Sequence, residues 1–230
     1  MEPFDVRPLG DQAIRVGFGN VVSKEIHQRI RTFCTLLEQI THPAVKEWVP
    51  SYTAVTIFYD CAYWSYEEAV KEIKRIAAMK MEGKQSLPAR IVRIPVCYGG
   101  KWGPDLAEVA SRNGITEEEV VRLHSDRTYL VYMIGFAPGF PYLGGLNPLL
   151  ATPRKKEPRR LVPAGSVGIA GEQTGIYPLA TPGGWQLIGQ TPFSLYDPNR
   201  EEPTLLRAGD ELIFYAISPR EFESIRMTHT

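Results

Sequence analysis

The sequence predicts a small α+β domain over residues 1–87, followed by a mostly β domain, closed into a barrel, over residues 88–230. A chain of 230 residues is longer than one average domain. Three observations support the division. Strand-like and helix-like apolar patterns alternate in the first part, a polar run and Pro88 interrupt them near residue 82, and about half of all glycines and prolines fall between residues 135 and 190.

The first domain is predicted to contain two strands and two helices. Residues 13–18 form a strand, and the β-branched and aromatic run 53–59 forms another. A helix lies between them, with Asn20 as its cap. Its apolar residues recur every three or four positions, at Val22, Ile26, Ile30, Phe33, Leu37 and Ile40. Ser65 and Glu68 have the spacing of a capping box that begins a second helix. Two helices on one face of a small sheet make an α+β sandwich.

The second domain is predicted to begin with a strand over residues 90–96. Two short helices follow, one from Pro104 to Asn113 and Gly114, the other from Thr116, which has capping-box spacing with Glu119. Residues 129–134 form a strand. The Gly/Pro-dense block 135–190 excludes helices, because proline removes a donor and clashes with the preceding turn, but it suits short strands and tight turns. A turn at 208–211 leads into a final strand.

Composition limits the classes of function. The chain has 26 basic and 26 acidic residues, so its net charge gives no field that attracts nucleic acid or a membrane surface. The N-terminus does not resemble a signal peptide, and no apolar run reaches the roughly 18 residues of a membrane span. We therefore expect a cytoplasmic protein. The three cysteines and four histidines are scattered, which predicts neither a disulfide framework nor a metal site.

The stretch 135–145 is rich in glycine but is not a phosphate loop, because it lacks the terminal G-K-[ST] and its prolines remove backbone donors. It forms either tight turns plugged by aromatic rings or a rigid aromatic surface that loses little entropy on binding. The candidates for a partner surface are Phe136, Pro138, Phe140, Tyr142 and Trp185.

The catalytic residues stay unassigned. Ser166 lies in A-G-S-V-G, close to the nucleophile elbow G-x-S-x-G, but the residues after it cannot start a helix and no histidine lies in the block to act as base. It is better interpreted as a turn hydroxyl or a ligand contact. His124, at the end of a predicted helix, is more often a packed histidine than a catalyst. Both are weak catalytic candidates.

Polar residues of the block suggest a binding site for a small polar ligand. The basic run 154–160 is either a solvated loop or an anion site formed by Arg154, Arg159 or Arg160, whose planar guanidinium groups suit carboxylate and phosphate. The run is too short to predict nucleic-acid binding. Gln173, Thr174 and Tyr177 offer hydrogen bonds to the same ligand, or they belong to hairpin turns over a plugged core.

Three strings carry a resemblance to a known family: GFAPGFPYLGGL, PRKKEPRRLVPAGSVGIAGEQTGIYP and TPGGWQLIGQTP. They resemble the allophanate hydrolase subunit 1 family, also called the Kip-type family or the family of 5-oxoprolinase B subunits. The resemblance implies a small α+β N-terminal domain and a cyclophilin-like β-barrel. It also implies a second subunit of related architecture, resembling the C-type component of 5-oxoprolinase, and a third protein resembling its A-type component. Together such proteins open 5-oxoproline to glutamate with hydrolysis of ATP.

The resemblance therefore implies a subunit that is inactive alone. ATP is used by the complex, at a site not located in this chain. Arg159 or Arg160 would hold the substrate carboxylate or an acyl-phosphate, and Gln173, Thr174 and Tyr177 would orient the ring amide. Related domains occur in urea carboxylase. The alternative is an inhibitor of a sporulation sensor histidine kinase, gripping a helical bundle through Phe136, Phe140 and Tyr142. A prolyl isomerase is a third option, by analogy of the barrel alone.

Overall fold

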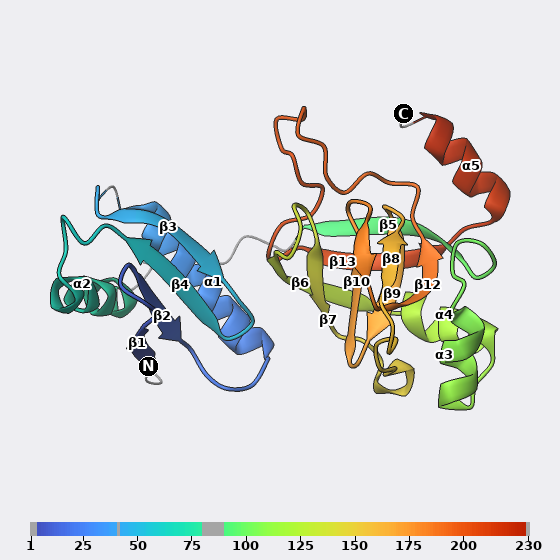
Figure 1. Ribbon diagram of the computed structural model, residues 1–230, viewed down its shortest axis with the longest axis horizontal. Helices are drawn as coiled ribbons and strands as arrows, with labels where there is room; N and C mark the ends of the chain where they lie inside the picture. The colour runs from blue at the N-terminus through green and yellow to red at the C-terminus, as the bar shows by residue number, and fades with distance from the viewer. Residues whose placement is uncertain (1–3, 41, 80–89, 229–230) are drawn as a thin grey trace. The chain divides into compact units, whose positions relative to one another are not determined.

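A computed structural model describes residues 4–40, 42–79 and 90–228 (Figure 1). The chain forms two compact units, Met1–Pro88 and Ala89–Thr230. The predicted linker at 82–88, and with it the boundary between residues 87 and 88, lies outside the described residues. Each unit is described by itself.

The first unit is a four-stranded antiparallel sheet packed against two helices. Along the chain the elements are β1 (Asp5–Pro8), β2 (Ala13–Gly17), α1 (Lys24–Glu38), β3 (Val45–Pro50), β4 (Ala54–Tyr59) and α2 (Tyr66–Ala78). The sheet order is β1-β2-β4-β3. Apolar residues of α1, α2, β2 and β4 share one core, which includes Ile14, Val16, Ile30, Phe33, Leu37, Val55, Ile57, Ile73 and Ile76. The helical and strand periodicities in the sequence arise from this shared core.

The N-terminus of α1 differs from the prediction. Its cap is Ser23, whose hydroxyl accepts a hydrogen bond from the Ile26 N–H at 3.2 Å, and not Asn20. Val22 precedes the helix and is 49% exposed, so it is not part of the buried stripe. The capping box of α2 is confirmed, because Ser65 and Glu68 exchange side-chain to backbone hydrogen bonds of 3.3 and 2.8 Å.

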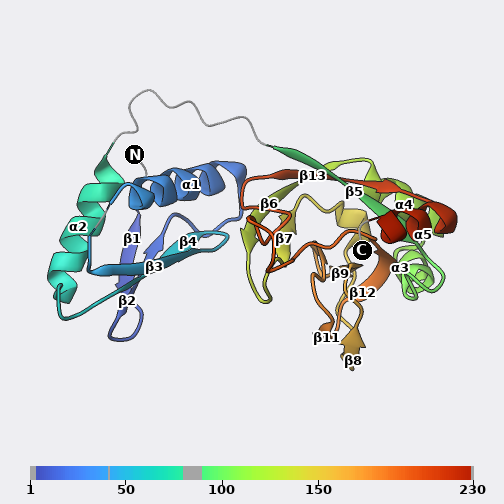
Figure 2. The ribbon, with the colours of Figure 1, turned by 90° about the horizontal axis from the view of Figure 1, so that it is seen from above.

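The second unit is built on a closed barrel with the strand order β10-β7-β6-β13-β5-β12-β9 (Figures 1 and 2). The β5–β13 pair is parallel, and the other neighbouring strand pairs of the barrel are antiparallel. The strands are β5 (Ile91–Tyr98), β6 (Thr128–Ile134), β7 (Pro141–Gly144), β9 (Ser166–Ala170), β10 (Gln173–Ile176), β12 (Gln186–Gln190) and β13 (Glu211–Ala216). The barrel predicted from the Gly/Pro-dense block is therefore confirmed.

Three helices and a short 3-10 helix flank the barrel: α3 (Leu106–Asn113), α4 (Glu117–Ser125), η1 (Pro148–Leu150) and α5 (Pro219–Thr228). α3 ends where predicted, because Gly114 adopts a left-handed φ of 65°. Thr116 caps α4 by accepting from the Glu119 N–H at 3.1 Å. α5 was not predicted, although its start has capping-box spacing: Ser218 and Glu221 exchange hydrogen bonds of 2.7 and 3.3 Å.

A two-stranded ribbon stands out from the barrel in Figure 2. It consists of β8 (Arg159–Val162) paired with β11 (Thr181–Gly183), with a register shift between Thr181 and Gly183. The basic run predicted to bind anions leads directly into β8. We call residues 154–162 together with β11 the arm. In the described part of the chain, no helix is both long and apolar enough to cross a membrane.

Candidate functional site

Aromatic rings from the Gly/Pro-dense block form a cluster between the barrel and the arm. Phe140, which directly precedes β7, packs edge-to-face on Tyr142, Tyr177 and Trp185, with centroid distances of 5.1, 5.6 and 5.6 Å. Tyr177 and Trp185 also meet edge-to-face, at 6.2 Å. Such perpendicular packing aligns the positive ring edge with the negative ring face. We call these four residues the aromatic cluster.

The loop that carries Phe136 consists of two consecutive tight turns. The Ala137 N–H donates to the Gly135 carbonyl at 2.8 Å, which closes a three-residue turn around Phe136 at a φ of 66°. The Phe140 N–H then donates to the Ala137 carbonyl at 3.0 Å, with Pro138 and Gly139 (φ 80°) at the centre of a type II turn. Phe136 therefore adopts a backbone conformation that costs about 1–2 kcal/mol for an L-residue. Its ring is 68% exposed, so burial of that ring does not offset the cost.

The predicted partner surface is only partly at the surface. Phe140 and Trp185 are 2% and 6% exposed, because their rings fill the aromatic cluster. Phe136 and Pro138 are exposed and Tyr142 is half-buried. Of the five residues predicted to form a partner surface, Phe136, Pro138 and Tyr142 therefore stay candidates.

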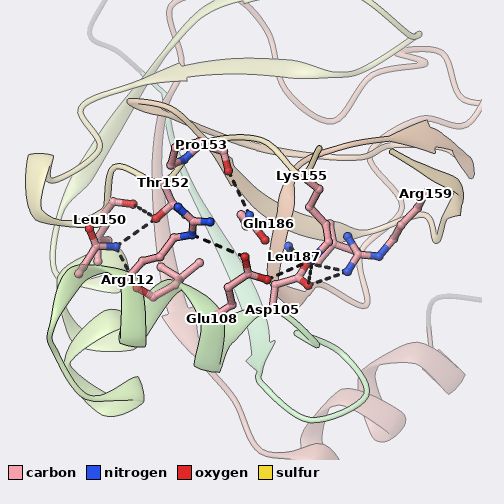
Figure 3. A network of polar contacts seen from close by, with 12 residues as sticks. Asp105, Glu108, Arg112, Leu150, Thr152, Pro153, Lys155, Arg159, Gln186 and Leu187 are labelled. Carbon is pink, nitrogen blue, oxygen red and sulfur yellow. Dashed lines mark hydrogen bonds and ion pairs between the residues drawn. The ribbon is translucent and has the colours of Figure 1, made fainter. Parts of the chain in front are cut away.

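Two cations of the basic run bind one buried carboxylate (Figure 3). Asp105, which precedes α3 and is 4% exposed, accepts two hydrogen bonds from the Arg159 guanidinium, at 2.7 and 2.8 Å. It also accepts from the Lys155 ammonium at 3.0 Å and from the Leu187 N–H of β12 at 2.7 Å. Burial alone raises the pKa of Asp105, but these donors outweigh it and lower the pKa below its usual value.

The network extends along α3. The Lys155 ammonium also contacts Glu108 at 3.2 Å, and Glu108 lies 3.6 Å from the Arg112 guanidinium, one turn further along the helix. The backbone N–H of Lys155 donates to the Gly184 carbonyl at 2.7 Å. The arm is thus held at its base by side-chain and backbone contacts. Asp105 was not among the site residues predicted from the sequence, because no local pattern pairs it with Arg159, 54 positions away.

The three predicted anion ligands have different surroundings. Arg159 already binds Asp105 and donates to the Trp185 carbonyl at 3.3 Å. The Arg154 guanidinium lies over the Trp185 ring, 6.0 Å from its centroid. Arg160 is exposed on β8. The structure therefore leaves Arg154 and Arg160 more accessible to an anion than Arg159.

His124 belongs to a buried polar chain inside the barrel. The Thr174 hydroxyl donates to the Gly168 carbonyl at 3.0 Å, so it accepts from His124 Nε2–H at 2.9 Å. Nδ1 then accepts from the Tyr98 hydroxyl at 2.8 Å. Burial, with a smaller contribution from Arg127, lowers the pKa of His124 to about 3. This fully buried, neutral ring has no contact with solvent through which it could act as a base.

The other predicted polar contacts are also mostly internal. Ser166 is 2% exposed and starts β9, so the chain continues as a strand where a nucleophile elbow requires a helix. Thr174 and Tyr177 are 0% and 2% exposed, whereas Gln173 is half-buried. Among the described residues, no three His, Cys, Asp or Glu side chains gather as a metal site. The ligand-binding roles of Gln173, Thr174 and Tyr177 stay predictions.

Comparison with known proteins identifies the family. Residues 4–206 match the family described as carboxyltransferase domain, subdomain C and D. The chain is 43% identical to the 5-oxoprolinase B subunit of Bacillus subtilis, over 97% of both chains. It is 52% identical to the 5-oxoprolinase B subunit of Escherichia coli O157:H7, over 90% of this chain and 93% of that one. The chain belongs to the family of 5-oxoprolinase B subunits. The family resemblance predicted from the Gly/Pro-dense block is thereby confirmed.

The fold of this family extends to larger proteins. The urea carboxylase of Kluyveromyces lactis matches 98% of this chain with a TM-score of 0.80 at 21% identity, and the match covers 23% of the yeast chain. At that identity the likeness shows a shared fold and no more.

Proposed function

We propose that this chain is the B-type subunit of a 5-oxoprolinase complex that converts 5-oxo-L-proline to L-glutamate with hydrolysis of ATP. The observation that carries the proposal is the identity of 43% and 52%, over at least 90% of the chain, to two proteins named as 5-oxoprolinase B subunits.

The surroundings of the candidate residues support dependence on partner subunits. His124 is buried and neutral, Ser166 lies within a barrel strand, and Arg159 is bound to Asp105. None of these three is positioned to attack or protonate a lactam from solvent. We therefore propose that the chain contributes binding surface and that partners complete the reaction centre.

The ring-opening reaction determines which chemical groups the complex has to provide. Ring opening breaks the amide C–N bond, adds the oxygen of water to the carbonyl carbon and places a proton on the leaving nitrogen. A stable lactam needs activation of its oxygen, which ATP provides by phosphorylation in our proposal. Within this chain, Arg154 is the residue to which we assign the substrate carboxylate or an acyl-phosphate. Its guanidinium lies over the Trp185 ring, whereas the cations that bind Asp105 are Lys155 and Arg159.

Reconstitution tests the function. The purified chain alone should release no glutamate from 5-oxoproline and ATP, and addition of the A-type and C-type components of 5-oxoprolinase should give ATP-dependent glutamate release. If the three proteins together leave 5-oxoproline intact, the proposal fails.

Arginine variants test the ligand assignment. Arg154→Ala should raise the KM for 5-oxoproline about tenfold or more, because a charge-assisted contact is lost. Arg122→Ala, which removes an exposed arginine of α4, should leave KM unchanged. If Arg154→Ala leaves the KM for 5-oxoproline unchanged, Arg154 is not a ligand of the substrate. If Arg159→Ala leaves turnover unchanged, Arg159 does not bind the anion as the sequence predicts.

The kinase-inhibitor alternative stays a prediction. It depends on an exposed aromatic surface, and burial of Phe140 reduces that surface to Phe136 and the half-buried Tyr142. Undiminished autophosphorylation of a cognate histidine kinase at saturating protein would exclude it.

A further inference from the structure

The side chain of Gln186 joins the first residue of β12 to the segment that carries Arg154 (Figure 3). Gln186 is 1% exposed, and its Nε2–H donates to the Pro153 carbonyl at 3.1 Å. Because a peptide unit is planar, this hydrogen bond restrains the whole unit that links Pro153 to Arg154. The ring of Pro153 further restricts the backbone of that residue. The peptide unit before Arg154 is therefore held from inside the protein.

The peptide unit after Arg154 is held as well. The Lys155 N–H donates to the Gly184 carbonyl at 2.7 Å, and the Lys155 ammonium contacts Asp105 at 3.0 Å. The backbone angles φ and ψ of Arg154 describe the rotation of its two flanking peptide units relative to each other. Since hydrogen bonds restrain both units, they also restrain the direction in which the Arg154 side chain leaves the backbone.

The far end of the Arg154 side chain lies on an aromatic ring. Its guanidinium is 6.0 Å from the centroid of Trp185, which is 6% exposed. The two residues on either side of Trp185 in the chain make the backbone contacts described above, one before Arg154 and one after it. Three consecutive residues of the chain thus determine both the backbone and the guanidinium position of Arg154.

The amide of Gln186 does more than fill space. Its Oε1 is buried and has no hydrogen-bond partner among the described residues. A buried acceptor without a partner costs free energy, which an apolar side chain of similar size avoids. The contribution that distinguishes Gln186 from such an apolar residue is therefore the hydrogen bond that it donates to Pro153.

We propose that Gln186 is a positioning residue for Arg154, and through Arg154 for the anionic group of the substrate. At 1% exposure Gln186 does not reach a substrate itself. It holds the backbone from which the Arg154 guanidinium contacts the carboxylate or acyl-phosphate. Arginine binds such groups through two parallel hydrogen bonds, a geometry that tolerates little displacement. This inference rests on the proposed function and on the contact assigned there to Arg154.

Kinetics of the reconstituted complex test the proposal. Gln186→Met removes the donor at a similar side-chain size, and it should raise the KM for 5-oxoproline about fivefold, the effect of one lost hydrogen bond. The kcat should not change, because Gln186 touches no reacting atom. Gln190→Met is the matched control: Gln190 lies four positions further along β12 and its Nε2–H donates to the Ala164 carbonyl at 2.7 Å. Its KM should equal that of the wild type.

A double-mutant cycle separates positioning from a general structural role. In an Arg154→Ala background, Gln186→Met should change the KM less than about twofold, because no guanidinium remains to be positioned. An equal effect in both backgrounds would show that Gln186 acts on the substrate by another route, and the positioning role would be wrong. It would also be wrong if Gln186→Met failed to fold or lowered kcat as well, because the residue would then support the barrel.

A crystal structure of the Gln186→Met chain gives a readout independent of activity. The barrel should be unchanged, and the Arg154 guanidinium should leave the Trp185 ring. If the wild-type complex hydrolyses 5-oxoproline and Gln186→Met has the wild-type KM, the positioning role is wrong and the proposed function stands. If the wild-type complex leaves 5-oxoproline intact, the proposed function is wrong and the crystal structure decides the local claim. A displaced Arg154 guanidinium would then support positioning by Gln186, and an unmoved one would overturn it.

Discussion

Replacement of Asp105 by asparagine tests whether one buried carboxylate connects the arm to the barrel. The variant keeps the shape of the side chain but removes the charge that Arg159 and Lys155 share. Loss of one partner of a buried ion pair costs about 3–5 kcal/mol. Because Arg159 and Lys155 are about a quarter exposed and can regain some water, we expect the lower end, about 3 kcal/mol. That change lowers the ratio of folded to unfolded protein by about two orders of magnitude.

Urea unfolding followed by circular dichroism measures this loss, and hydrogen exchange of the Leu187 amide, which donates to Asp105, reports it locally. Glu108→Gln is the matched control, because Glu108 is 42% exposed and its ion pairs contribute about 0–1 kcal/mol. The pKa of Asp105 is lowered in the folded state, so its stabilisation is complete above the unfolded pKa of about 3.9 and is lost as the pH falls through the folded value. The difference between wild type and variant should therefore be constant from pH 7 to 5 and shrink below pH 4. A loss below about 1 kcal/mol, equal to that of Glu108→Gln, would refute the reasoning.

Three further predictions concern other positions in the second unit. The pKa of His124 is lowered to about 3, so protonation favours the unfolded chain. Between pH 7 and pH 5, the free energy of unfolding of the wild type should fall by about 2 kcal/mol through this protonation. His124→Gln should not show this fall, because its amide does not titrate and can replace both hydrogen bonds. Urea unfolding midpoints at the two pH values measure the difference. Phe136→Gly should be about 1 kcal/mol more stable than Phe136→Ala, because glycine tolerates the φ of 66°. Both variants lack the aromatic ring, so they should weaken partner binding equally. Equal stability of the two variants would show that the turn is unstrained. In Gly103→Ala the new methyl would lie 2.0 Å from the Ile188 carbonyl, so thermal unfolding should show a loss of about 1–3 kcal/mol. Gly184→Ala, with its nearest neighbour at 3.6 Å, should stay near wild type.

Local sequence patterns predicted those helices and strands that are determined by residues close to one another in the chain. The capping boxes, the left-handed Gly114 and the β-branched runs led to α2, α3, α4 and β4, because neighbouring residues determine them. β1 and β3 were missed, since both are edge strands with mostly exposed or half-buried residues and no buried run. α5 was missed although the spacing of Ser218 and Glu221 was visible, because a single short helix with one buried residue, Phe222, has little apolar periodicity.

The candidate site was predicted less completely. The sequence indicated the correct region, but it could not distinguish exposed aromatic residues from buried ones. Phe136 and Phe140 lie four positions apart in the same loop, yet one is 68% exposed and the other 2%. The difference depends on Tyr177 and Trp185, which reach Phe140 from elsewhere in the block.

By itself, the sequence indicated the family and the presence of a barrel. Glycines, prolines, arginines and a glutamine occur across the block in the order on which the family resemblance rests, and the density of glycine and proline favours short strands and tight turns. The tertiary structure decided which of its charges are accessible. Arg159 and Arg160 are adjacent and chemically identical, but the fold brings Asp105 from 54 positions away to Arg159 and leaves Arg160 exposed. A buried carboxylate requires a partner cation, and chain folding alone determines which cation it meets.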